Sequence, residues 1–326
     1  MADEIKQHTV TPFEASVDSF SHKDVSGNPN HDKRAMIPSL VIRSLLIAIC
    51  IGMFGYAVFM LASSAIETEE VNDLYDSVRP ESQTSAIKPS TPLLEPSPMY
   101  TLQQMVDANG KYNNYVGDVS SIDDIARRSS YYRNYKNFKS RYPDAFAWIY
   151  VNHTQIDYPV MKGPYTDYYL YHNINGNKSS SGSIVAETNL SNNYDENLNT
   201  VIYGHCMKNG SMFRTLKTFL ESANKNTLAK TMEIEIYTED GLYIYKILSG
   251  YREDGAHFAK TFFRDVNDYQ NFLDNIASKN TLRYSEKYNS SSKVVTLITC
   301  ANVSSNEEER YVLHGVLVSF IPASQL

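Results

Sequence analysis

The sequence has few cysteines, and their small number excludes a disulfide framework. Only Cys50, Cys206 and Cys300 occur among 326 residues, so the fold must depend on a hydrophobic core. No Cys-x-x-Cys pair is present, which argues against a structural zinc site, and no other cluster of metal ligands is evident in the sequence. We therefore expect neither a metal nor a cofactor.

Signatures of nucleotide and nucleic-acid binding are missing as well. The chain contains no glycine-rich phosphate loop and no internal repeat of fixed period. Its net charge is −7, with both signs scattered along the sequence, so the basic footprint of a nucleic-acid-binding protein is absent. The length suits one large domain or two modest ones.

One long uncharged run, residues 44–66, predicts a membrane anchor. As a helix, these residues span about 34 Å, enough to cross a hydrocarbon core of about 30 Å. The polar tail before the run, within residues 1–43, has no periodicity and ends in basic residues, whereas acidic residues follow the run at once. The positive-inside rule then places residues 1–43 in the cytoplasm and everything after the run outside the cell.

A cleaved signal peptide is the alternative interpretation of this run. The run is long for a signal peptide and begins late in the chain, which favours an uncleaved anchor. We therefore expect a single-pass protein of the plasma membrane, with Cys50 inside the anchor.

The residues after the anchor divide into a stalk and a globular domain. Residues 67–119 include a window rich in proline, serine, threonine and glutamate, which predicts an extended stalk. The prolines of this window are Pro80, Pro89, Pro92, Pro96 and Pro98. From about residue 120 the pattern becomes globular, so we expect a folded domain to occupy residues 120–326.

Short strands with a few inserted helices predict a mixed, mainly β fold, best described as a β-barrel. Ser121 and Ser211 are candidate helix caps, and the aromatic and basic stretch 131–142 before Pro143 predicts a further helix. Apolar spacing predicts helices after Ser211 and over residues 266–276. Strands are expected over residues 146–151, 156–160, 183–186, 199–205, 232–237, 242–248, 292–299 and 311–320.

The apolar, β-branched run 294–299 ends on Cys300, which makes this cysteine a candidate nucleophile. A cysteine at the tip of a rigid strand is held in place and still reachable. The alternative is an ordinary buried cysteine, which packs as a small apolar residue. A thiol with a pKa near about 8.5 needs a base or a positive field to act as a nucleophile at neutral pH.

His205 and Arg310 are the residues best placed to assist the thiol. His205 follows an apolar strand pattern and Gly204, so a strand delivers its imidazole to a strand end. Arg310 is the only Lys or Arg after Cys300, and a hairpin would return it beside the end of the preceding strand. Its guanidinium can then stabilise a carbonyl oxygen or an oxyanion. A surface ion pair with the acidic residues just before it is the alternative.

These residues resemble a known family. Residues 296–300, Thr-Leu-Ile-Thr-Cys, are similar to the Thr-Leu-x-Thr-Cys signature of the sortases, the cysteine transpeptidases of Gram-positive cell surfaces. Tyr203-Gly204-His205 resembles the histidine strand of that family, and Arg310 its arginine. The order His, Cys, Arg along the chain is also that of the family. The resemblance spans roughly residues 125–323 and implies an eight-stranded barrel with added helices, preceded by one transmembrane helix.

Within this family the chain is most similar to class B. Residues 148–152 and 156–160 resemble the early strands of that class, and a helix between two late strands is also a class B feature. The resemblance implies that Cys300 attacks the threonine carbonyl of a C-terminal sorting signal, resembling Asn-Pro-x-Thr-Asn or Leu-Pro-x-Thr-Gly, and forms a thioacyl-enzyme. His205 would then act as general acid and base, and Arg310 would hold the carbonyl oxygen.

Three further residues are candidate substrate contacts by the same resemblance: Thr166, Ile298 and Thr299. Ile298 stands where class B members often have serine, and Ala301 where an acidic residue is frequent, so the peptide specificity stays open. Cys206 directly follows His205. Strand alternation points its side chain away from the histidine and predicts a structural role, while a strand that ends earlier would allow a reversible disulfide with Cys300.

Three functions compete at this point. The first is a transpeptidase that joins surface proteins carrying a sorting signal to an amine of a cell-wall peptide or peptidoglycan precursor. The second is a pilin polymerase with a lysine side chain as acceptor. The third is a non-catalytic surface domain that binds a partner, which would need none of His205, Cys300 and Arg310. The sequence does not separate the first two.

Overall fold

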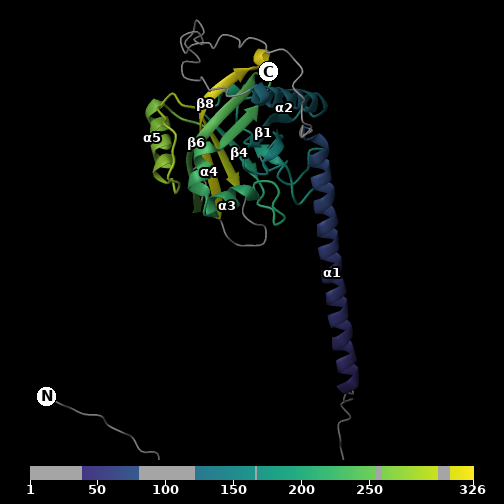
Figure 1. Ribbon diagram of the computed structural model, residues 1–326. Coiled ribbons are helices and arrows are strands. Elements are labelled where there is room, and N and C mark those ends of the chain that lie inside the picture. The colour runs from purple at the N-terminus through teal and green to yellow at the C-terminus, as the bar shows by residue number, and fades with distance from the viewer. Residues whose placement is uncertain (1–38, 81–121, 166, 255–258, 300–308) are drawn as a thin grey trace, which may run out of the picture. The chain divides into compact units, whose positions relative to one another are not determined.

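The computed structural model describes residues 39–80, 122–165, 167–254, 259–299 and 309–326, and the chain divides into two units, Met1–Val58 and Phe59–Leu326. The second unit contains a closed barrel (Figure 1). Its strands are β1 (Ala145–Val151), β2 (Asp157–Met161), β3 (Ile184–Ala186), β4 (Asn199–Gly204), β5 (Glu233–Tyr237), β6 (Gly241–Asp254), β7 (Val294–Thr299) and β8 (Glu309–Pro322).

The strands follow the order β1-β2-β3-β4-β7-β8-β6-β5, and β5 closes the barrel against β1. Two neighbouring pairs, β2 with β3 and β4 with β7, are parallel, and the other pairs are antiparallel. The long strands β6 and β8 pair along their whole length, from Gly241 opposite Pro322 to Asp254 opposite Glu309. The prediction of a mixed, mainly β barrel with eight strands is confirmed.

Alternation along β7 divides its side chains between the main core and a second, smaller layer. Val295 and Leu297 belong to the main core, whereas Val294 and Ile298 belong to two smaller apolar clusters on the other face of the strand. Because both faces of β7 are covered, all six of its residues are buried, and the strand reads as a continuous apolar run. The end of such a strand is a rigid support for a reactive group.

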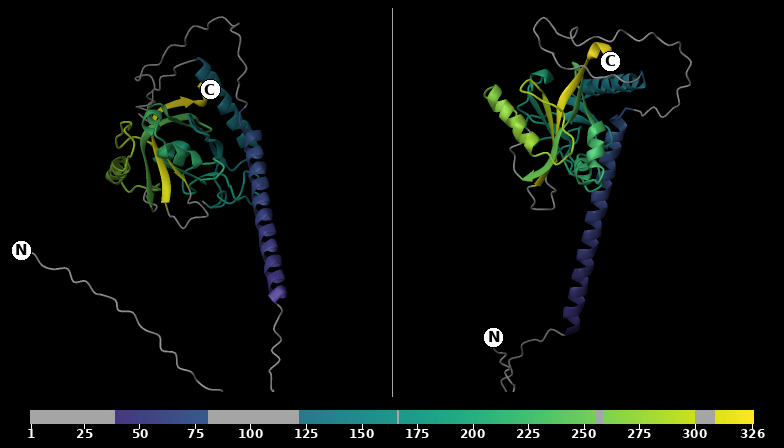
Figure 2. Two further views of the ribbon diagram at one scale, coloured as in Figure 1. Left: turned by 60° about the horizontal axis from the view of Figure 1, so that its bottom comes forward. Right: turned by 60° about the vertical axis from the view of Figure 1, so that its left-hand side comes forward.

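Helix α5 (Val266–Ser278) covers part of that second face. Its buried residues Tyr269, Phe272, Leu273 and Ile276 form one cluster with Leu248 of β6, Val294 of β7 and Val316 of β8. Asp265 caps the helix, because its side chain accepts a hydrogen bond from the backbone amide of Asp268. The helix lies beside the barrel in both views of Figure 2. One face of the helix is buried, as its amphipathic pattern predicts.

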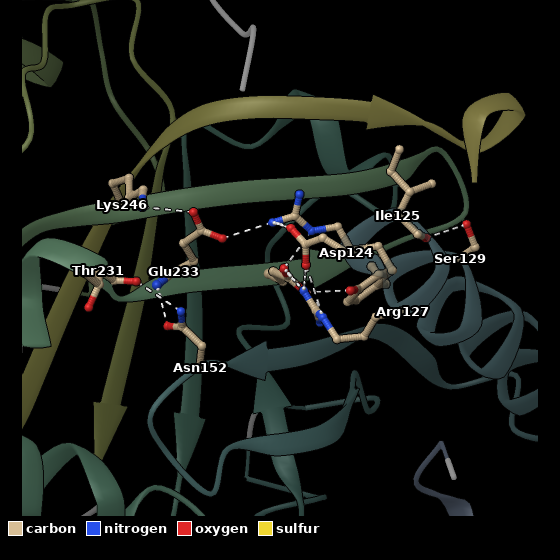
Figure 3. A network of polar contacts seen from close by, with 11 residues as sticks. Asp124, Ile125, Arg127, Ser129, Asn152, Thr231, Glu233 and Lys246 are labelled. Carbon is tan, nitrogen blue, oxygen red and sulfur yellow. Dashed lines mark hydrogen bonds and ion pairs between the residues drawn. The ribbon is translucent and has the colours of Figure 1, made fainter. Parts of the chain in front are cut away.

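Helix α2 (Ile122–Arg141) is one continuous helix where the sequence predicted two, because no Gly or Pro interrupts residues 122–141. It is held by an ion-pair network with a buried centre at Arg128 and Glu235 (Figure 3). Arg128, 4% exposed, donates from Nε to Glu235 at 2.9 Å and from Nη2 to Glu233 at 3.0 Å. Arg127 reaches the same Glu235 carboxylate at 2.7 Å. These charges fix the position of α2 on β5.

Two short helices follow β4, namely α3 (Arg214–Glu221) and α4 (Lys225–Thr231). The predicted cap at Ser211 is wrong: α3 begins after Phe213 without a side-chain cap, and Ser211 instead bonds to Asn209. Met212 has a φ of 55°, which interrupts the chain just before the helix. Helix α4 has no counterpart among the helices expected from the sequence.

Helix α1 (Ser39–Val78) contains the whole apolar run and continues past it. At 40 residues it is about 60 Å long, twice the thickness of a hydrocarbon core. It is long and apolar enough to cross a membrane. The first residues of the predicted stalk, 67–78, are therefore helical, because the first proline after the anchor is Pro80. The rest of the predicted stalk up to residue 119 lies almost entirely outside the described residues.

Candidate active site

Three strand ends meet at one edge of the barrel and define the candidate site. Gly204, the last residue of β4, is paired with Thr299, the last residue of β7. On the other side of β7, the backbone amide of Tyr311 in β8 donates to Thr299 Oγ1 at 2.9 Å. The residue before Cys300 therefore contacts both the residue before His205 and the residue after Arg310. Cys300 itself lies outside the described residues.

His205 is buried, with 5% of its surface exposed, and one of its ring nitrogens is engaged. Nε2 donates to the backbone carbonyl of Leu170 at 2.7 Å. Since a carbonyl can only accept, the neutral imidazole carries its proton on Nε2 and leaves the Nδ1 lone pair as its acceptor. Burial lowers the pKa of His205 below its ordinary value, and the hydrogen bond to Leu170 raises it in part.

The segment around Leu170 is a part of the site that sequence reasoning missed. The exposed ring of Tyr171 lies with its centroid 6.1 Å from that of His205. The group that orients the imidazole is a backbone carbonyl, which any residue type could supply. For that reason no pattern in the sequence could have identified Leu170.

Arg310 lies near the start of β8 and is half-buried. Its Nη1 donates to the backbone carbonyl of Glu309 at 3.2 Å. The carboxylate of Glu309 pairs with Arg252 of β6. Glu307 and Glu308, the other acidic residues just before Arg310, lie outside the described residues, so the alternative of a surface ion pair for Arg310 stays a prediction.

The three candidate substrate contacts have different surroundings. Thr166 lies outside the described residues. Ile298 is buried, at 1% exposure, in a cluster with Val201 and Val312. Thr299 is also buried, and its hydroxyl accepts the hydrogen bond from Tyr311 that joins β7 to β8. The side chains of Ile298 and Thr299 thus support the strand end in this structure.

Cys206 follows the end of β4 and is buried, at 8% exposure. It forms an isolated bridge with Met212, and Arg214 Nη1 donates to its sulfur at 3.8 Å. These contacts are those of a structural residue. The alternative disulfide with Cys300 involves a residue outside the described ranges and stays a prediction.

A buried chain of hydrogen bonds lies behind the site on the same face of β7 as Ile298. Asn199 Nδ2 donates to the carbonyl of Lys260 at 2.8 Å, and Asn199 Oδ1 accepts from Thr296 Oγ1 at 2.7 Å. The Thr296 hydroxyl must then accept from Nδ1 of His314, 2.9 Å away, and Nε2 of His314 accepts from Tyr251, also at 2.9 Å. His314 is therefore neutral and protonated on Nδ1.

The surroundings of His314 keep it neutral. It has no exposed surface, and burial, with a smaller contribution from the charge of Lys279, lowers its pKa to about 3. This chain of hydrogen bonds joins β4, β7, β8 and β6 to the segment that follows β6. It fixes the register of the strands that end at the site.

Comparison with known proteins gives a consistent result. The sortase domain family matches residues 149–318, a range that includes His205, Cys300 and Arg310. Sortase B of Listeria monocytogenes is 28% identical over 179 residues, which cover 54% of this chain and 70% of that protein. Sortase B of Staphylococcus aureus is 28% identical over 178 residues, with the same shares covered. The crystal structure of Clostridium perfringens sortase B is 33% identical, with a TM-score of 0.50, and the match covers 56% of this chain and 99% of that one.

Proposed function

The chain belongs to the sortase family and is a class B sortase, a cysteine transpeptidase, and from this premise we propose that Cys300, His205 and Arg310 carry its chemistry. The observation that supports this assignment most strongly is the pairing of Thr299 with both Gly204 and Tyr311. Consecutive Cα atoms are about 3.8 Å apart, so a residue adjoining Thr299 starts within reach of both neighbouring strand ends.

In the proposed reaction the Cys300 sulfur attacks the carbonyl carbon of the threonine in a C-terminal sorting signal. The peptide bond after that threonine breaks, a thioester forms on the sulfur, and the departing amine takes a proton from His205. Arg310 stabilises the oxyanion of the tetrahedral intermediate. An acceptor amine then attacks the thioester and loses its proton to His205, the carbon–sulfur bond breaks, and Cys300 leaves as a thiolate beside the imidazolium.

The hydrogen bond of His205 determines which nitrogen serves in these steps. Since Nε2–H is donated to Leu170, the proton must be taken up and given back at Nδ1. The lowered pKa of the imidazole means that the protonated form needed by the departing amine is a minority at neutral pH. The thiolate and imidazolium pair would then also be a minor form of the free enzyme.

For the substrates we propose a surface protein ending in a sorting signal similar to Asn-Pro-x-Thr-Asn or Leu-Pro-x-Thr-Gly, and a cell-wall peptide amine as acceptor. We propose further that α1 anchors the chain with residues 1–43 in the cytoplasm and the barrel outside. The apolar run and the basic residues before it support this orientation.

The assignment of the nucleophile is tested by comparing two cysteine variants of the full chain. Cys300→Ala should abolish cleavage of a sorting-signal peptide, whereas Cys206→Ser should retain most of the cleavage rate, because the contacts of Cys206 within the described residues are with Met212 and Arg214. Circular dichroism would confirm that both variants are folded. Retained cleavage in folded Cys300→Ala would contradict the assignment.

A further inference from the structure

The last turns of α1, beyond the apolar run, pack on the barrel. Val71, Tyr75 and Val78 recur at helical spacing and are 5%, 1% and 6% exposed. The carbonyl of Val78 accepts from Asn134 of α2 at 2.9 Å, and Arg79 Nε donates to the carbonyl of Asp157 at 3.0 Å. This part of α1 lies in the same compact unit as the barrel. It has the burial and the contacts of a domain element.

Two polar side chains of these turns contact the segment that precedes β3. Glu67 accepts a hydrogen bond from the backbone amide of Ser180 at 2.7 Å. The buried hydroxyl of Tyr75 donates to the carbonyl of Gly182 at 2.9 Å and lies 3.0 Å from Ser183 Oγ. The Tyr75 ring also packs edge-on against Tyr158, with a centroid separation of 5.4 Å. Tyr75 is thus fixed at both its ring and its hydroxyl.

The segment that Tyr75 holds is packed directly against Leu170. The amide of Ser183 donates to the carbonyl of Tyr169 at 2.8 Å. Gly182 has a φ of +53°, and a Cβ on it would lie 2.1 Å from the Leu170 carbonyl oxygen. Only glycine permits so close an approach. The position of Gly182 therefore sets the position of the Leu170 carbonyl.

That carbonyl is the acceptor for His205 Nε2. We propose that the turns of α1 after the membrane anchor brace the loop that orients the catalytic histidine, with Tyr75 as a positioning residue. The path runs from the Tyr75 hydroxyl to Gly182, from Gly182 to the Leu170 carbonyl, and from this carbonyl to the imidazole. The proposal rests on the function proposed above, because it assigns to His205 its role in proton transfer.

The test uses the full chain in nanodiscs and compares Tyr75→Phe with Tyr135→Phe. Tyr135 is the matched control: it is 1% exposed, and its hydroxyl also donates to a backbone carbonyl, that of Phe146, at 3.4 Å. Two properties are measured for each variant. The first is the pH titration of the His205 ring by NMR with labelled histidine, assigned with His205→Gln. The second is kcat and KM for a sorting-signal peptide.

Tyr75→Phe is expected to shift the His205 resonances and their titration midpoint, and to lower kcat about fivefold with little change in KM, the rate equivalent of one ordinary hydrogen bond. Tyr135→Phe should leave all of these unchanged even if its thermal midpoint falls equally. Glu67→Ala, which removes the acceptor for Ser180, should act in the same direction as Tyr75→Phe.

The proposal is overturned if Tyr75→Phe, folded, leaves the titration of His205 and kcat as they are in the unchanged chain. The NMR titration needs no catalysis, so it separates the two proposals. Should the unchanged chain fail to cleave any peptide while Tyr75→Phe still shifts the His205 titration, the bracing would stand and the proposed function would fall.

Discussion

Gly182 shows how a single residue without a side chain can shape the site. Its left-handed φ disfavours a Cβ, and the short distance to the Leu170 carbonyl excludes one. Gly176 also has a left-handed φ, of +77°, but a Cβ there would meet nothing closer than the Tyr168 hydroxyl at 3.5 Å. Alanine substitutions at the two glycines therefore distinguish the cost of a left-handed backbone, which both share, from the cost of a clash with Leu170, which arises at Gly182 alone.

Gly182→Ala should lower stability by several kcal/mol and impair thioacylation, while Gly176→Ala should cost about 1 kcal/mol, the left-handed strain alone, and leave thioacylation intact. Urea denaturation and the rate of adduct formation measure the two effects. Equal stability losses and equal rates in both variants would show that the contact of Gly182 with Leu170 has no role in the site.

His314 is predicted to make the protein sensitive to acid. Its folded-state pKa of about 3 lies below the unfolded value of about 6.5, so the unfolded chain binds more protons between these values. Its contribution to stability is therefore complete above about pH 6.5 and is lost as the pH falls. Between pH 7 and pH 5 the loss should be about 2 kcal/mol.

The measurement is the free energy of unfolding of the unchanged chain and of His314→Gln at pH 7 and at pH 5. Because glutamine does not titrate, the stability difference between the two proteins should shrink by about 2 kcal/mol at the lower pH. A difference that is the same at both pH values would argue against a neutral, buried His314.

At the scale of elements, α2 depends on buried charge. Removing Arg128 leaves Glu235, which is 1% exposed, with less compensation, so Arg128→Met should destabilise the protein by about 3–5 kcal/mol. Lys136→Met removes an exposed pair of the same helix, 3.9 Å from Glu239, and should cost less than about 1 kcal/mol. Thermal midpoints would compare the variants. Similar small losses in both would mean that the network in Figure 3 does not hold α2.

The elements also show what the sequence could and could not predict. The strands of the barrel follow from runs and alternation, and His205 and Arg310 follow from their places at strand ends. The prediction of a stalk over residues 67–78 is explained by the prolines that follow them, of which Pro80 is the first. Within these residues, Val71, Leu74, Tyr75 and Val78 have the spacing of one face of a helix. The acceptor for His205 is the backbone carbonyl of Leu170, which every residue type has, so the sequence cannot predict this contact.

At the scale of the whole molecule, both flanks of residues 81–121 are attached to the barrel. The end of α1 contacts the segment before β3, and α2 contacts β5 and the end of α1. The proline-rich part of the predicted stalk lies outside the described residues, so its role as a spacer stays a prediction. Glu67, which contacts Ser180, is the first residue after the apolar run. If α1 anchors the chain as proposed, we predict that the segment around Ser180 lies close to the membrane surface.

Fluorophores on Lys178→Cys and Glu239→Cys test this closeness, in full-length chains whose native cysteines are replaced by serine. Position 178 is exposed and near Ser180, whereas Glu239 lies in the turn between β5 and β6. A quencher on lipid headgroups in nanodiscs should quench the fluorophore at 178 more strongly than that at 239. Equally weak quenching at both positions would instead favour a barrel held away on a stalk.

The role of Cys300 is tested most directly by intact-mass spectrometry of the full chain mixed with a sorting-signal peptide in the absence of an acceptor amine. We expect a mass gain equal to the part of the peptide up to its threonine, mapped to Cys300 and released by an added amine. Peptides with Asn-Pro-x-Thr-Asn and Leu-Pro-x-Thr-Gly would show which signal is preferred. An adduct on Cys206, or none on a folded protein with a free Cys300 thiol, would contradict the proposed mechanism.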